Sequence, residues 1–194
     1  VEEAVAVDVE HLDAAAVREW MRASQTALGN RRAEIDALNV YPVPDGDTGT
    51  NMYLTVEAAA ISAMEITDPR PEPGPVAEAL ARGALLGARG NSGVILSQML
   101  RGFADVLATT PAPDGAALSA GLTRAADLAY SAVSRPVEGT VLTVARAAAE
   151  AGAQVAQSGL AHVAKAASGK AHEALALTPT QLPELAAAGG VDAG

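Results

Sequence analysis

The chain of 194 residues has no cysteine, which excludes a disulfide framework, a thiolate metal site and a cysteine nucleophile. Aromatic residues are scarce, at 3% of the sequence. Alanine is abundant instead, and this combination favours helices that approach one another closely through small side chains.

Basic residues are also few, because 13 Lys and Arg stand against 23 Asp and Glu and leave a net charge of −10. This balance argues against a nucleic-acid-binding surface, which needs a basic patch. No apolar run approaches the roughly 18 residues of a membrane span, and no signal peptide is visible. The sequence therefore predicts a soluble, cytoplasmic, helical domain.

Apolar residues recur with helical periodicity almost throughout, and glycine and proline punctuate the pattern. No convincing strand is visible, and the short connections predict antiparallel neighbours in an all-α, up-and-down bundle of about eight helices. The first helix should place Trp20 in the core, together with Val17 and Met21. Residues 1–12 read as an N-terminal extension, 69–75 as a linker, and 13–194 as one domain of a longer protein. Helices are expected over residues 13–27, 31–38, 49–64, 76–86, 94–107, 114–133, 139–155, 160–177 and 178–187, the last opened by a capping box.

The most informative segment is residues 39–52, Asn-Val-Tyr-Pro-Val-Pro-Asp-Gly-Asp-Thr-Gly-Thr-Asn-Met, here named the aspartate motif. Asp45 and Asp47 flank a glycine in a loop stiffened by two prolines. Such neighbouring carboxylates suit a hard cation like Mg²⁺, which commonly uses one or two carboxylates plus substrate phosphates. Alternatively, the same residues form an ordinary Asp-Gly turn and a helix cap.

Two other functional loops that begin similarly are excluded. An EF-hand starting at Asp45 needs glycine and glutamate where Thr50 and Val56 stand. A phosphatase of the Asp-x-Asp-Gly type needs its aspartate at the end of a buried strand, and residues 40–44 are too proline-rich for a central strand.

Three further segments have compatible chemistry. The glycine motif, residues 87–93, leads directly into a helix. It either binds an anion through the backbone N–H groups of the helix N-terminus or is an ordinary helix–helix turn. The third motif, residues 135–143, places Thr140 at a helix start, either as a cap or as a ligand contact. The closing motif, residues 188–194, contributes Asp192 and is ambiguous by itself.

In this order, the four motifs closely resemble the N-terminal ATP-binding domain of bacterial fatty acid kinase, which is similar to the ADP-binding L subunit of dihydroxyacetone kinase. The resemblance covers nearly the whole chain, from about Asp13 to Gly194. It implies a closed barrel of about eight antiparallel amphipathic helices, with ATP or ADP bound among the loops at one end.

By position, the resemblance assigns two Mg²⁺ ions and the catalytic role to Asp45 and Asp47. Asn39 is the nearest counterpart of a third metal-binding aspartate, although it stands one residue further upstream. The nucleotide contacts that the resemblance implies fall on Thr48, Gly49, Thr50, Asn51, Met52, Asn91, Ser92, Gly93, Thr140, Leu142 and Asp192.

The resemblance further implies phosphoryl transfer from ATP to a fatty acid carboxylate. A separate lipid-binding partner protein would present the fatty acid, docking mainly outside this domain, and the full-length protein is a possible homodimer. A carboxylate is already ionised at neutral pH and needs no general base, so the lack of an obvious catalytic histidine is expected. The isolated domain should bind nucleotide but transfer phosphate poorly.

Two alternatives stay open. A dihydroxyacetone kinase subunit would keep ADP as a bound cofactor, but that family has an aspartate where Thr143 stands. A non-catalytic nucleotide-sensing scaffold would not need both aspartates of the motif.

Overall fold

The computed structural model describes residues 10–68 and 72–194, so most of the predicted N-terminal extension and part of the predicted linker lie outside the described residues. The described residues form helices without any strand, which confirms the predicted all-α bundle. Within them, no helix is both long and apolar enough to cross a membrane. The helices are α1 (Ala14–Leu38), α2 (Thr48–Met64), α3 (Pro73–Gly87), α4 (Gly90–Leu107), α5 (Gly115–Ser131), α6 (Val141–Gln154), α7 (Leu160–Gln181) and α8 (Pro183–Ala188).

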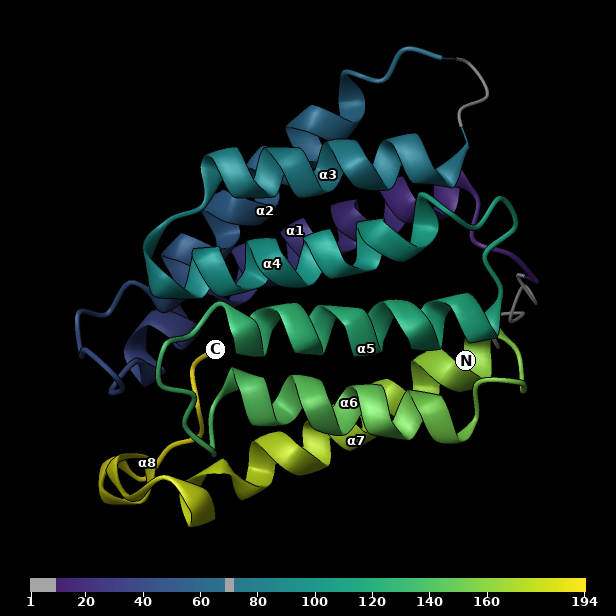
Figure 1. Cartoon of the computed structure of the whole chain (residues 1–194). Helices are drawn as coiled ribbons and strands as arrows, with labels where there is room; N and C mark the ends of the chain where they lie inside the picture. Colours follow the sequence, from purple (N-terminus) through teal and green to yellow (C-terminus); the bar gives the residue numbers. More distant parts are fainter. Residues whose placement is uncertain (1–9, 69–71) are drawn as a thin grey trace, which may run out of the picture.

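Each long helix contacts the next one along the chain, as expected for an up-and-down arrangement, and Figure 1 shows α3, α4, α5 and α6 running side by side. The main core lies between α1, α2, α3 and α4. Alanine and glycine let the helices approach closely there, since Ala59 and Ala84 are fully buried. Among the described residues the backbones of α1 and α7 do not approach each other closely, so the closure of the barrel that the resemblance implied stays a prediction.

Three sequence-based expectations about helices are wrong. The first concerns residues 28–30, where α1 continues without the predicted break. A glycine inside a helix costs about 1 kcal/mol, which packing against a neighbouring helix can outweigh. Here Gly29 lies against the ring of Tyr53 on α2, where a Cβ would be 3.2 Å from the nearest ring carbon.

The second concerns α7, which runs through Pro179 to Gln181 rather than ending at residue 177. Pro179 has no N–H to donate to the carbonyl of Leu175, four residues earlier. The hydroxyl of Thr178 donates to that carbonyl instead, at 2.8 Å, so the lost helix bond is replaced. The predicted capping box therefore lies inside a helix, and the last short helix begins at Pro183.

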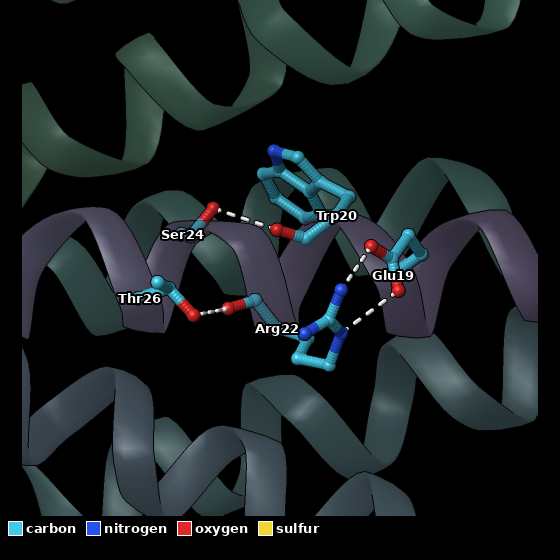
Figure 2. A network of polar contacts seen from close by, with 5 residues as sticks. All are labelled: Glu19, Trp20, Arg22, Ser24 and Thr26. Atoms are coloured by element: carbon cyan, nitrogen blue, oxygen red, sulfur yellow. Dashed lines mark hydrogen bonds and ion pairs between the residues drawn. The ribbon is translucent and has the colours of Figure 1, made fainter.

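The third concerns Trp20, which is 43% exposed rather than part of the core. Its indole packs at a tilt against the ring of Phe103, with 5.2 Å between ring centroids. Figure 2 shows it on α1 beside the surface ion pair of Glu19 and Arg22. Since Phe103 belongs to α4, Trp20 covers the edge of the core between α1 and α4 rather than lying inside it.

Candidate functional site: a cavity where three helices begin

A cavity of about 430 Å³ lies at the end of the bundle where α2, α4 and α6 begin. Its size falls within the range of small-molecule sites, roughly 300–1,000 Å³. Its walls are mainly apolar and come from α4, from the segment after α5 and from the start of α6. The apolar lining residues are Val94, Ile95, Leu96, Met99, Val133, Val137, Val141 and Leu142.

None of these three helices is capped by the side chain of its own N-cap residue, which is Asp47 for α2, Arg89 for α4 and Thr140 for α6. By contrast, Asp13 and Asp114 cap α1 and α5. Those two helices begin together at the other end of the bundle. Helix N-termini carry unpaired N–H groups and a partial positive charge. Three such termini therefore meet at the cavity, and those of their N–H groups that no side chain accepts can bind an anion.

The aspartate motif borders this cavity through Tyr41, Pro42, Thr48 and Met52. Asp45 is exposed and accepts a hydrogen bond of 2.7 Å on Oδ1 from the side-chain amide of buried Asn39. The half-buried Asp47 makes no capping hydrogen bond with its side chain.

The side chains of Asp45, Asp47 and Asn39 fit magnesium as ligands. Their carboxylate and amide oxygen atoms are of the kind that this ion prefers. Within residues 10–68 and 72–194, no group of three His, Cys, Asp or Glu residues could hold a metal by itself. An ion bound by Asp45 and Asp47 would thus complete its shell with water and phosphate oxygens, as magnesium commonly does with nucleotides.

The glycine motif packs closely on the start of α2. The hydroxyl groups of Ser92 and Thr48 are 3.5 Å apart, and both residues line the cavity. Gly90 has φ +57, and a Cβ on it would overlap the side-chain amide of Asn51. Glycine is therefore required here both by backbone conformation and by space.

The third motif is fixed by polar contacts around Glu138. Its carboxylate accepts hydrogen bonds of 2.6 Å from Thr143 and from Arg146, and its pKa is lowered, first by Arg146 and then by Thr143. Thr143 also accepts a hydrogen bond of 3.0 Å from the backbone of Gly139. The hydroxyl of Thr140 donates to the carbonyl of Val137 at 2.8 Å. These contacts hold one wall of the cavity in place.

Asp192, in the closing motif, lines the same cavity. The residue is nevertheless largely buried, with 9% of its surface exposed. The carboxylate accepts the backbone N–H of Gly194 at 3.1 Å, and it also lies near the backbone N–H of Val141, the first residue of α6. Burial raises its pKa to about 6, against the lowering effect of these two N–H groups. Its own backbone N–H donates to Thr178 at 3.1 Å, next to Pro179 of α7. Asp192 thus places a buried carboxylate beside the start of α6.

The cavity brings together half of the predicted site. The predicted residues that line it are Thr48, Met52, Asn91, Ser92, Thr140, Leu142 and Asp192. Those that do not line it are Asn39, Asp45, Asp47, Gly49, Thr50, Asn51 and Gly93.

Sequence reasoning gave no role to several lining residues. Arg135 contributes the one positive side chain among the residues that line the cavity. Its place as the first residue of the third motif was a usable signal. The apolar wall of Val94, Ile95 and Met99 gave no such signal, because a helical apolar face reads as core from sequence. Asp36, which contacts the start of α2, was also missed.

Comparison with known proteins identifies the family of this chain. The DAK2 domain matches residues 42–194. Protein YloV of Bacillus subtilis is 41% identical over 192 residues, which are 97% of this chain and 34% of that protein. Proteins of Staphylococcus saprophyticus and Staphylococcus aureus (strain USA300) are 42% and 40% identical over 173 and 169 residues, each covering 86% of this chain and 30% of the relative.

The chain thus spans about a third of the length of these relatives. The family match includes all four cavity-bordering motifs except the first three residues of the aspartate motif. The chain belongs to the DAK2 domain family, and it is a nucleotide-binding domain of the dihydroxyacetone kinase L-subunit-like kind.

Proposed function

We propose that this chain is the ATP- and Mg²⁺-binding domain of a kinase that transfers the γ-phosphate of ATP to a fatty acid carboxylate. The observation that carries the nucleotide part is the meeting of three helix N-termini at one mainly apolar cavity, with Asp45 and Asp47 on the loop that leads into the first of these helices. The apolar wall suits the nucleotide base, and the helix N-termini suit its phosphates. The aspartates suit the Mg²⁺ ions that would accompany the phosphates.

In the proposed reaction, a carboxylate oxygen of the fatty acid attacks the γ-phosphorus as the bond to the β,γ-bridging oxygen breaks. The products are an acyl phosphate and ADP, and no proton has to be removed from the nucleophile. Two Mg²⁺ ions held by Asp45 and Asp47, with Asn39 as a further oxygen donor, would neutralise charge on the phosphate oxygens. The chain's own contribution is to position the nucleotide, through Thr48, the glycine motif and the third motif.

The acyl acceptor is the part of the proposal that rests on the resemblance of the four motifs to fatty acid kinase. We propose that a lipid-binding partner protein presents the fatty acid in the cytoplasm, and that it docks mainly on regions beyond this chain. The relatives, which are about three times as long as this chain, offer room for such regions.

The nucleotide site is tested by calorimetric titration of the chain with a non-hydrolysable ATP analogue, with and without Mg²⁺. We expect binding at one site that strengthens with Mg²⁺, and we expect Asp47→Ala to remove the Mg²⁺-dependent part. Because the Asp47 side chain caps no helix, this variant should keep a melting temperature close to that of the wild type.

Asp114→Ala is the matched control, since Asp114 is also an N-cap aspartate but lies at the other end of the bundle. It should lose about 1 kcal/mol of stability with its cap and keep full Mg²⁺-dependent binding. Equal loss of binding in both variants, or no Mg²⁺ effect in the wild type, would contradict the proposed site.

A further inference from the structure

Helix α2 receives its N-terminal cap from another helix. The side chain of Asp36, on the last turns of α1, accepts the backbone N–H of Thr50 on Oδ1 at 2.9 Å. Its Oδ2 accepts the hydroxyl of the same threonine at 2.7 Å. Thr50 is the third residue of α2, and its N–H is one of the groups that an N-cap side chain normally accepts.

Two other aspartates of the same molecule show the normal arrangement. Asp13 accepts the N–H of Ala16 at 2.7 Å, and Asp114 accepts that of Ala117 at 3.0 Å, so each caps its own helix three residues on. Both have extended backbone, with ψ of 173° and −164°, whereas Asp47 has ψ of 3°. Asp47 therefore occupies the N-cap position of α2, but its side chain accepts no N–H group of this helix.

The packing of α1 on α2 fixes Asp36 in this role. Gly49 lies so close to α1 that a Cβ on it would overlap the carbonyl oxygen of Arg32. The Arg32 side chain donates to the hydroxyl of Thr50 at 2.8 Å, and its guanidinium lies 5.8 Å from the ring centroid of Tyr53. The carboxylate of Asp36 is thus aligned with the first turn of α2 by several contacts.

We propose that Asp36 is a positioning residue for the magnesium site: by capping α2 in place of Asp47, it leaves the Asp47 carboxylate free to bind a cation beside Asp45. This inference rests on the proposed function, because it requires that Asp45 and Asp47 bind Mg²⁺. If Asp36 were absent, the N–H of Thr50 would lack an acceptor, and Asp47 would be drawn back to its own helix.

The test compares the affinity for a non-hydrolysable ATP analogue with and without Mg²⁺ in the wild type, Asp36→Ala and Asp36→Asn. Residues that orient metal ligands typically change metal affinity by about 10- to 100-fold. We expect Asp36→Ala to reduce the Mg²⁺-dependent gain in affinity by about tenfold while the Mg²⁺-free affinity stays near that of the wild type. Asp36→Asn keeps an acceptor for the N–H and should hold the gain within about threefold of wild type.

The possible outcomes distinguish a failure of the proposed function from a failure of the positioning role of Asp36. No Mg²⁺-dependent gain in the wild type would contradict the proposed function itself. If the wild type shows the gain, an unchanged Asp36→Ala, or one that loses affinity equally with and without Mg²⁺, would overturn the positioning role. Should Asp36→Ala not fold, a tenfold loss of the gain in Asp36→Asn would also overturn it, since charge rather than capping would then be responsible.

Discussion

Asp192 shows how one side chain can join segments that are remote from each other in the sequence. Its buried carboxylate lies beside the start of α6 and also lines the cavity, so a structural and a ligand-facing position meet in one group. The nucleotide contact that the resemblance assigned to it stays a prediction. Its burial, however, has a direct consequence for stability.

We predict that Asp192 makes the stability of the domain depend on pH in a mildly acidic range. Folding raises the pKa of this carboxyl from 3.8 to about 6, so the folded state holds the proton more tightly. The resulting stabilisation is complete below about pH 4 and is lost as pH rises through about 6, by about 3 kcal/mol at most. Asp192→Asn should lack this loss, which urea denaturation between about pH 4 and 7 would measure.

The exposed Asp127→Asn variant controls for the removal of one negative charge. The free energy of unfolding of Asp192→Asn, relative to wild type, should rise across this pH range, and that of Asp127→Asn should not. A constant difference for Asp192→Asn would show that burial does not perturb this carboxyl.

At the scale of helices, small residues set how closely neighbours approach. Gly102 of α4 faces the backbone of α5, and a Cβ on it would lie 2.6 Å from the nitrogen of Ala125 and from the carbonyl oxygen of Arg124. No side chain can move aside there, because both neighbours are backbone atoms. Contact between α4 and α5 therefore depends on glycine at this position.

We predict that Gly102→Ala destabilises the domain by about 1–3 kcal/mol through overpacking. The matched control is Gly169→Ala on α7, where an added Cβ meets nothing within 4 Å. That change should instead stabilise the domain by up to about 1 kcal/mol, because alanine is the better helix former. Thermal or urea unfolding of both variants measures the contrast, and equal effects would refute the close approach.

On the scale of the whole molecule, the described helices form an up-and-down bundle in which the backbones of α1 and α7 do not approach each other closely. The cavity at one end of this bundle is lined by residues of four separate motifs. Under the proposed function, the acyl acceptor would need regions beyond this chain to reach the site, so binding and transfer should be separable experimentally.

We expect the 194-residue chain to bind the ATP analogue but to phosphorylate free fatty acid far more slowly than about 1 per second, the lower end of kinase turnover. The measurement compares acyl phosphate formation by this chain and by the full-length protein, each with and without a lipid-binding partner protein. Turnover typical of kinases in the isolated chain would contradict the need for regions outside it.

The sequence by itself predicted the helices, because apolar periodicity and glycine or proline breaks are local signals. It also identified the aspartate and glycine motifs, whose residues such as Thr48 and Ser92 come together at the cavity. It failed where tertiary packing outweighed local propensity, as at Gly29, or where a hydroxyl replaced a missing N–H, as at Pro179.

Only the tertiary structure decided which carboxylate caps which helix. In sequence, Asp47 directly precedes α2 and is the expected cap, yet the packing of α1 on α2 gives the cap to Asp36. Likewise, Asp192 reaches α6 only because the end of the chain returns past α7 to the cavity. Periodicity tells which face of a helix is buried but not which helix covers it. Contacts between remote segments therefore follow from packing alone.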